Sequence, residues 1–169
     1  KIIYDGFKLA IAAGVPKEKA GILVDEQFGH EIITDAKANG YHVANPAEKS
    51  GQEEYDFEYG ADFGKHIEQF DPRFVKVLVL YNPEGDAEMN QRQTKRLKEL
   101  SEFCDSKASN QYLFELLVPA TKAQLDAVGG DKAKFDKDVR PALMVQAMEE
   151  LQKSGVDPDI WKLEGVDST

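Results

Sequence analysis

The sequence of 169 residues is poor in cysteine and has no long uninterrupted apolar run. Its single cysteine, Cys104, excludes a disulfide within the chain and is typical of a reducing compartment, so we expect a cytoplasmic protein in which this thiol lies in the core. No stretch approaches the roughly 20 apolar residues that cross a bilayer, so we expect no membrane partner. The formal net charge of -10 also disfavours nucleic acid.

Apolar strands alternate with helical segments along the chain, which we interpret as one domain over residues 1–169. Continuously apolar runs bounded by turn residues predict strands, and apolar residues at helical spacing predict helices. The expected strands are 21–24, 41–44, 76–81, 112–118 and 159–166. The expected helices are 2–13, 32–38, 61–70, 87–107, 121–128 and 135–154. Strands joined by crossover helices indicate a parallel sheet.

Ionisable residues lie in or directly after the expected strands: Asp25, Glu26, Glu48, Lys49, Lys76, Glu115, Lys162 and Glu164. In a (β/α)₈ TIM barrel, catalytic groups gather at the carboxyl ends of different strands. An open doubly wound sheet offers a crevice at one switch point and does not easily assemble charges from all five strands. We therefore predict an α/β fold of the TIM-barrel type. Such barrels typically need about 250 residues, so the chain is expected to hold about five central strand–helix units of a longer polypeptide.

Two strand lysines carry the chemical interpretation. Lys162 lies between Trp161 and Leu163 in what reads as a buried strand, and Lys76 lies in another apolar strand. An unpaired buried ammonium is costly, and burial favours the neutral amine that attacks a carbonyl to form a Schiff base. The competing interpretation of each lysine is a structural salt bridge inside the fold.

Five segments together carry a family resemblance. They are GILVDEQFG (21–29), PAEKSG (46–51), KVLVLYNP (76–83), FELLVP (114–119) and WKLEG (161–165). In this order they resemble a bacterial family of class I aldolase-like barrels that occurs alone or fused behind a sugar kinase in myo-inositol catabolism. The family is more distantly similar to tagatose-1,6-bisphosphate aldolase.

The resemblance implies an activity that needs no cofactor and no metal. The expected reaction cleaves 2-deoxy-5-keto-gluconate 6-phosphate, a phosphorylated keto-sugar acid, to dihydroxyacetone phosphate and malonic semialdehyde through a lysine Schiff base. A fused sugar-kinase domain is the implied protein partner. The resemblance also implies a preceding strand with an aspartate and two following strands with the phosphate site. We therefore expect little activity from this chain alone, and we expect its open sheet edges to pair with another copy or with further segments.

The resemblance assigns roles residue by residue. Lys162 matches the Schiff-base lysine, Lys76 a second strand lysine whose charge assists it, and Glu115 the acid/base glutamate. The polar positions expected to bind substrate at the mouth of the barrel are Asp25, Glu48 and Lys49. Glu164 is the fourth residue expected to bind substrate, and apart from the resemblance we interpret it as an interior partner that orients Lys162 and not as a proton shuttle.

Other interpretations stay open. Asp25 can cap a following helix, and Glu48 with Lys49 can form a solvated turn. Asp25, Glu48 and Glu115 could instead hold magnesium or manganese, because these ions prefer oxygen ligands. The three histidines show no metal-ligand spacing. A non-catalytic domain that scaffolds or regulates a fused kinase is a further interpretation, since fold alone does not decide function.

Overall fold

The computed structural model describes residues 2–166 and contains one five-stranded sheet. All neighbouring strands are parallel, and their order follows the chain: β1-β2-β3-β4-β5. The strands are β1 (Gly21–Leu23), β2 (His42–Pro46), β3 (Phe74–Leu80), β4 (Gln111–Leu117) and β5 (Ile160–Leu163). The predicted α/β class and parallel sheet are confirmed.

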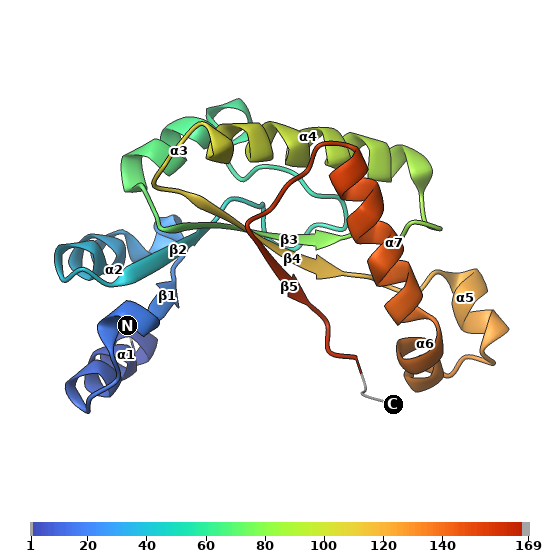
Figure 1. Cartoon of the computed structure of the whole chain (residues 1–169), viewed down its shortest axis with the longest axis horizontal. Helices are drawn as coiled ribbons and strands as arrows, with labels where there is room; N and C mark the ends of the chain where they lie inside the picture. Colours follow the sequence, from blue (N-terminus) through green and yellow to red (C-terminus); the bar gives the residue numbers. More distant parts are fainter. Residues whose placement is uncertain (1, 167–169) are drawn as a thin grey trace.

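Helices connect each strand to the next. The α-helices are α1 (Ile2–Ala12), α2 (Glu26–Ala38), α3 (Phe63–Phe70), α4 (Ala87–Asp105), α5 (Lys122–Ala127), α6 (Lys132–Asp138) and α7 (Arg140–Lys153). Two short 3₁₀ helices, η1 (Lys17–Lys19) and η2 (Gly60–Asp62), complete the set. Figure 1 shows α3, α4 and α7 on one side of the central strands. No helix of the described part of the chain has the length and apolar character needed to cross a membrane.

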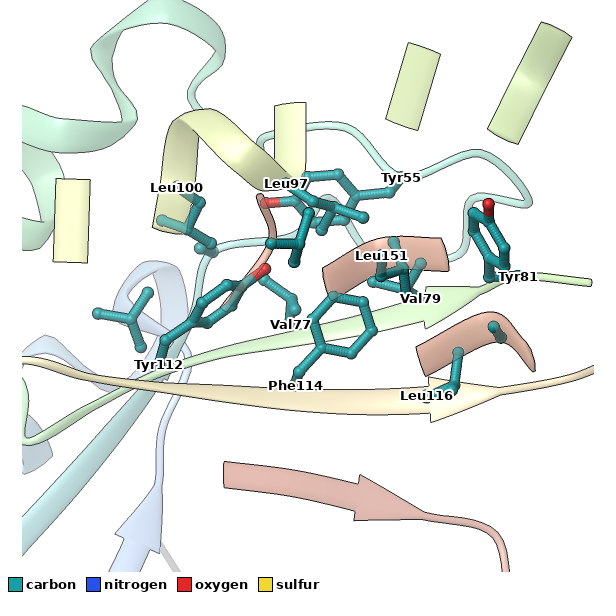
Figure 2. Packing of buried hydrophobic residues seen from close by; sticks show 14 of the residues in the cluster. Tyr55, Val77, Val79, Tyr81, Leu97, Leu100, Tyr112, Phe114, Leu116 and Leu151 are labelled. Atoms are coloured by element: carbon teal, nitrogen blue, oxygen red, sulfur yellow. The ribbon is translucent and has the colours of Figure 1, made fainter. Parts of the chain in front are cut away.

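The helix-covered face of the sheet holds the core. Val77 and Val79 of β3 and Phe114 of β4 are fully buried, and they pack with Leu97 of α4 and residues of α7 (Figure 2). A second cluster joins β1 and β2 to α1 and α2. Because side chains alternate along a strand, the register places all these buried residues on one face. The opposite face is therefore free to carry the polar residues of β3, β4 and β5.

The sequential strand order decides against a doubly wound sheet, in which the order reverses at a switch point. Sequential parallel strands with helices packed on one face are the arrangement of a barrel segment. Within residues 2–166, β1 and β5 are edge strands, so the described sheet is open. The described part of the chain is thus an open parallel sheet whose core lies on its helix-covered face.

Three local predictions need correction. The second helix begins at Glu26 and not at residue 32, because Asp25 accepts a hydrogen bond from the Gln27 N–H (2.8 Å) and caps it. The segment predicted as one helix over 135–154 is two helices that meet at Val139. The β5 strand is not a buried central strand, because only β4 pairs with it. Cys104 is buried as expected, and burial raises the pKa of its thiol to about 12, so it is a poor nucleophile.

Candidate active site

Four charged side chains form a continuous series across β2 to β5. Lys76 Nζ lies 2.7 Å from Glu48 Oε1 and 3.2 Å from Glu115 Oε2. The other oxygen of Glu115, Oε1, accepts a hydrogen bond from Lys162 Nζ. Glu48, Lys76, Glu115 and Lys162 are hereafter the lysine–carboxylate row. The row alternates in charge and brings together both lysines and the glutamate that the sequence singled out.

Strand register explains this convergence. Lys76, Glu115 and Lys162 all occupy the face of the sheet opposite the buried core, because each alternates with core residues. Glu115 pairs directly with Lys162 across β4 and β5, and Lys76 lies one pleat earlier on β3. A lysine side chain is long enough to span that diagonal step. Glu48 follows the end of β2 and is held by a bridge to Phe57.

Burial differs sharply along the row. The side chains of Lys76, Glu48 and Glu115 are 10%, 13% and 15% exposed, whereas that of Lys162 is 61% exposed. Lys162 therefore lies at the open end of the row and not in the buried environment that the sequence suggested. The physical reason is the position of β5 at the edge of the described sheet.

The two carboxyl groups of the row lie in opposite electrostatic situations. For Glu115, burial acts to raise the pKa, but hydrogen bonds from Lys162 and Lys76 outweigh it and hold the pKa below its usual range. For Glu48, burial is the largest effect and raises the pKa although Lys76 opposes it. Glu48 Oε2 is also buried without a hydrogen-bond partner. Two carboxyl groups with divergent proton affinity thus share one lysine.

The remaining expected substrate-binding residues are placed differently. Asp25 caps α2 through its own side chain, as the structural interpretation of that residue predicted. Lys49 is exposed, and its backbone N–H donates to Asp56 O (2.9 Å) in the loop after β2. The described contacts place neither residue in the lysine–carboxylate row.

Glu164 is bound to a residue that the sequence did not single out. Its Oε1 accepts a hydrogen bond from Arg140 Nη1 (2.6 Å), and its Oε2 accepts one from the backbone N–H of Val118 (2.8 Å). Glu164 therefore joins the end of β4 to α7, and the expectation that it orients Lys162 directly has no contact in its support within residues 2–166. A cavity of about 370 Å³ opens beside this pair and beside Leu80 and Leu117.

A buried amide network supports the carboxyl ends of β3 and β4. Asn82 donates to Pro119 O (2.8 Å) and to Gln124 Oε1 (2.7 Å), and its backbone oxygen accepts from Asn90 Nδ2 (2.8 Å). Gln93 donates to Leu80 O (3.0 Å) and accepts from the Tyr55 N–H (3.2 Å). Sequence reasoning missed this network because amide residues in loops and helices carry no periodic signal.

The part of the chain from residue 2 to residue 166 contains no group of three histidine, cysteine or acidic side chains arranged to hold a metal ion. Glu48 and Glu115, two of the ligands considered for magnesium or manganese, instead contact the ammonium group of Lys76. Asp25, the third, caps α2.

The fold and the row define a parallel α/β protein with a lysine–carboxylate site on the uncovered face of its sheet. Residues 5–169 match the family described as uncharacterized proteins conserved in bacteria (DUF2090), and the chain belongs to this family. A comparison with curated proteins found no significant match.

Proposed function

We propose that this chain is the catalytic part of a class I aldolase that cleaves a phosphorylated keto-sugar acid through a Schiff base on Lys162. The observation that carries the proposal is the contact of both strand lysines with Glu115, one lysine to each carboxylate oxygen. An amine and a second cation, each within hydrogen-bonding reach of one carboxylate, are groups that imine chemistry uses.

The proposal includes closure of the sheet into a TIM barrel by strands outside this chain. The sequential parallel order and the one-sided helix cover support it. So does the polar row on the uncovered face, which would then point into the barrel interior. Closure would cover β5 and remove Lys162 from solvent, an environment that favours the neutral amine.

The proposed reaction gives a role to three members of the row. Lys162 attacks the keto carbon of 2-deoxy-5-keto-gluconate 6-phosphate and forms a protonated imine with loss of water. Glu115 then accepts the proton of the hydroxyl group on the carbon two positions away, and the bond from that carbon to the carbon next to the imine breaks. Its electron pair moves into the protonated imine, malonic semialdehyde leaves, and an enamine of dihydroxyacetone phosphate remains. Lys76 supplies the neighbouring positive charge throughout.

Borohydride reduction tests the proposal. The full-length protein that contains this chain is incubated with the keto-sugar acid phosphate, or with dihydroxyacetone phosphate as the product ketone, and is then reduced, digested and analysed by mass spectrometry. We expect a stable adduct on Lys162 and none on Lys153, an exposed lysine of α7 that serves as the internal control. An adduct on another lysine removes the assignment of Lys162. The absence of any adduct and of cleavage favours the scaffold interpretation, and loss of activity with chelators favours the metal-dependent one.

A further inference from the structure

Glu48 is the member of the lysine–carboxylate row that the proposed reaction does not yet use. Its Oε1 contacts Lys76 Nζ at 2.7 Å, and the same Nζ contacts Glu115 at 3.2 Å. Only 13% of the Glu48 side chain is exposed. The two glutamates thus contact one ammonium group.

The free oxygen atom distinguishes the two glutamates. Both oxygens of Glu115 accept hydrogen bonds or ion-pair contacts from lysines, whereas Glu48 Oε2 is buried with no hydrogen-bond partner among residues 2–166. A buried carboxylate oxygen without a donor is costly, but a protonated carboxyl group there is itself a donor. The terminal torsion of a glutamate is broad, so rotation can present either oxygen to the uncovered face.

The groups around Glu48 act on its pKa in opposing directions, and the effects that raise it are the larger. Lys76 and Glu115 face it from β3 and β4, and the hydroxyl groups of Tyr55 and Tyr112 lie close enough for its charge to affect them. Burial raises the pKa of Glu48, and the negative charge of Glu115 adds to this, while Lys76 opposes both. Glu48 therefore holds a proton more readily than Glu115 does.

We infer that Glu48 is the catalytic acid that protonates the enamine carbon after bond cleavage, while Glu115 serves as the base for the hydroxyl group. This inference rests on the proposed function. The division matches a general pattern in which two carboxyl groups in unlike environments take the acid and base roles.

The step balances. The Glu48 O–H bond breaks, its proton forms a C–H bond at the enamine carbon, and the enamine electron pair supplies that bond. The product is the protonated imine of dihydroxyacetone phosphate, which water hydrolyses to the free ketone and the protonated Lys162 amine. Glu115 has gained one proton and Glu48 has lost one, so exchange with solvent or through Lys76 restores the starting state. No oxidant or reductant is required.

Solvent exchange of dihydroxyacetone phosphate isolates this step, because in reverse Glu48 removes a proton from the hydroxymethyl carbon of the bound imine. The probe is dihydroxyacetone phosphate in heavy water, incubated with the full-length protein that contains this chain and followed by NMR, with borohydride trapping in parallel. In Glu48→Gln we expect trapping on Lys162 to persist and deuterium exchange to fall by about 100-fold or more. Glu115→Gln is the matched contrast and should lose cleavage but retain exchange. Glu31→Gln, on the exposed surface of α2, should change neither.

The pH profile of the unmodified protein provides a second test that does not depend on how a variant folds. Because removal of the carbon-bound proton needs ionised Glu48, exchange should rise with pH through a value above the ordinary 4.5 of glutamate. This rise should be missing from Glu48→Gln. Normal exchange in Glu48→Gln, joint loss of trapping and exchange in it, or a wild-type profile without the rise overturns the inference. A wild-type protein that forms no imine overturns the proposed function and the inference with it.

Discussion

Glu115 and Lys162 face each other across the β4–β5 ladder, and the carboxylate accepts a hydrogen bond from the lysine amine. Glu115 is mostly buried and Lys162 mostly exposed, so the pair joins the protected interior of the row to its open end. Before Lys162 can attack a carbonyl, it must give up a proton, and cover of β5 by further strands would favour its neutral amine. The pair is therefore both a structural ion pair and the starting state of the proposed reaction.

Lys162→Met should abolish aldol cleavage without unfolding the protein. Removal of a nucleophile that acts with partner groups typically lowers kcat by several orders of magnitude, and we expect a loss of about 1,000-fold or more. The stability effect should stay within about 0.5 kcal/mol, because the side chain is 61% exposed. Enzyme assay and urea denaturation measure the two effects.

The matched control for this variant is Lys153→Met, which removes an exposed lysine from α7. It should leave both cleavage and stability unchanged. Full activity in Lys162→Met would show that the amine has no covalent role and would support a scaffold or regulatory function.

Lys76→Met should destabilise the fold strongly. Lys76 is 10% exposed and contacts two carboxylates that are themselves mostly buried. Removing one partner of a buried ion pair typically costs 3–5 kcal/mol, because the remaining charges lose their compensation, so we expect about 3 kcal/mol or more from urea denaturation.

The double variant Lys76→Met with Glu48→Gln should recover part of this loss, since it also removes one uncompensated charge. Additive effects of the two substitutions would contradict the coupling that the 2.7 Å contact implies.

Glu48 and Glu115 should give the protein opposite dependences of stability on pH. The raised pKa of Glu48 means that the folded state binds its proton more tightly, so its contribution falls as pH rises from 4.5 through the folded value. The lowered pKa of Glu115 stabilises the fold above pH 4.5, the ordinary pKa of glutamate. This contribution is lost as the pH falls through the pKa of Glu115 in the folded state. Glu48→Gln should therefore lower the free energy of unfolding less at pH 7 than at pH 4. Glu115→Gln should lower it more at pH 7 than at pH 4.

Denaturation of both variants and the wild type at several pH values measures these slopes. Between the unfolded and folded pKa values of a carboxyl group, each pH unit changes the difference in free energy of unfolding between variant and wild type by up to about 1.4 kcal/mol. Parallel pH profiles for the two variants would show that the carboxyl groups do not differ in proton affinity. Glu31→Gln serves again as the exposed control.

Gly29→Ala should destabilise the contact between β1 and α2. A Cβ atom at this position would lie 2.1 Å from Val24 Cγ1, and the backbone there leaves the helical conformation (φ −128°, ψ 20°). Relief requires movement of a buried valine, so we expect a loss of about 1–3 kcal/mol in thermal or urea unfolding.

The double variant Val24→Ala with Gly29→Ala provides the control, since it removes the clashing methyl group. Gly29→Ala should lower the free energy of unfolding less in the Val24→Ala background than in the wild-type protein. Equal losses in both backgrounds would mean that the crowding is not the cause.

Local pattern was enough to predict the alternation of strands and helices and the burial of Cys104. These features depend on side-chain periodicity and on apolar content, which are properties of short segments. The predicted TIM barrel stays a prediction, since five sequential strands agree with it and do not close it.

Which charged side chains contact each other was decided only by the tertiary structure. Glu48 reaches Lys76, and Glu164 turns to Arg140, because of strand register and helix placement that link residues 28 and 24 positions apart. Asp25 caps a helix through a local contact, and the sequence was compatible both with this role and with substrate binding. The exposure of Lys162 depends on which strands flank β5, and the unlike environments of the two glutamates depend on how much surface covers each. Distances and burial of this kind arise only when distant segments pack, so no local pattern encodes them.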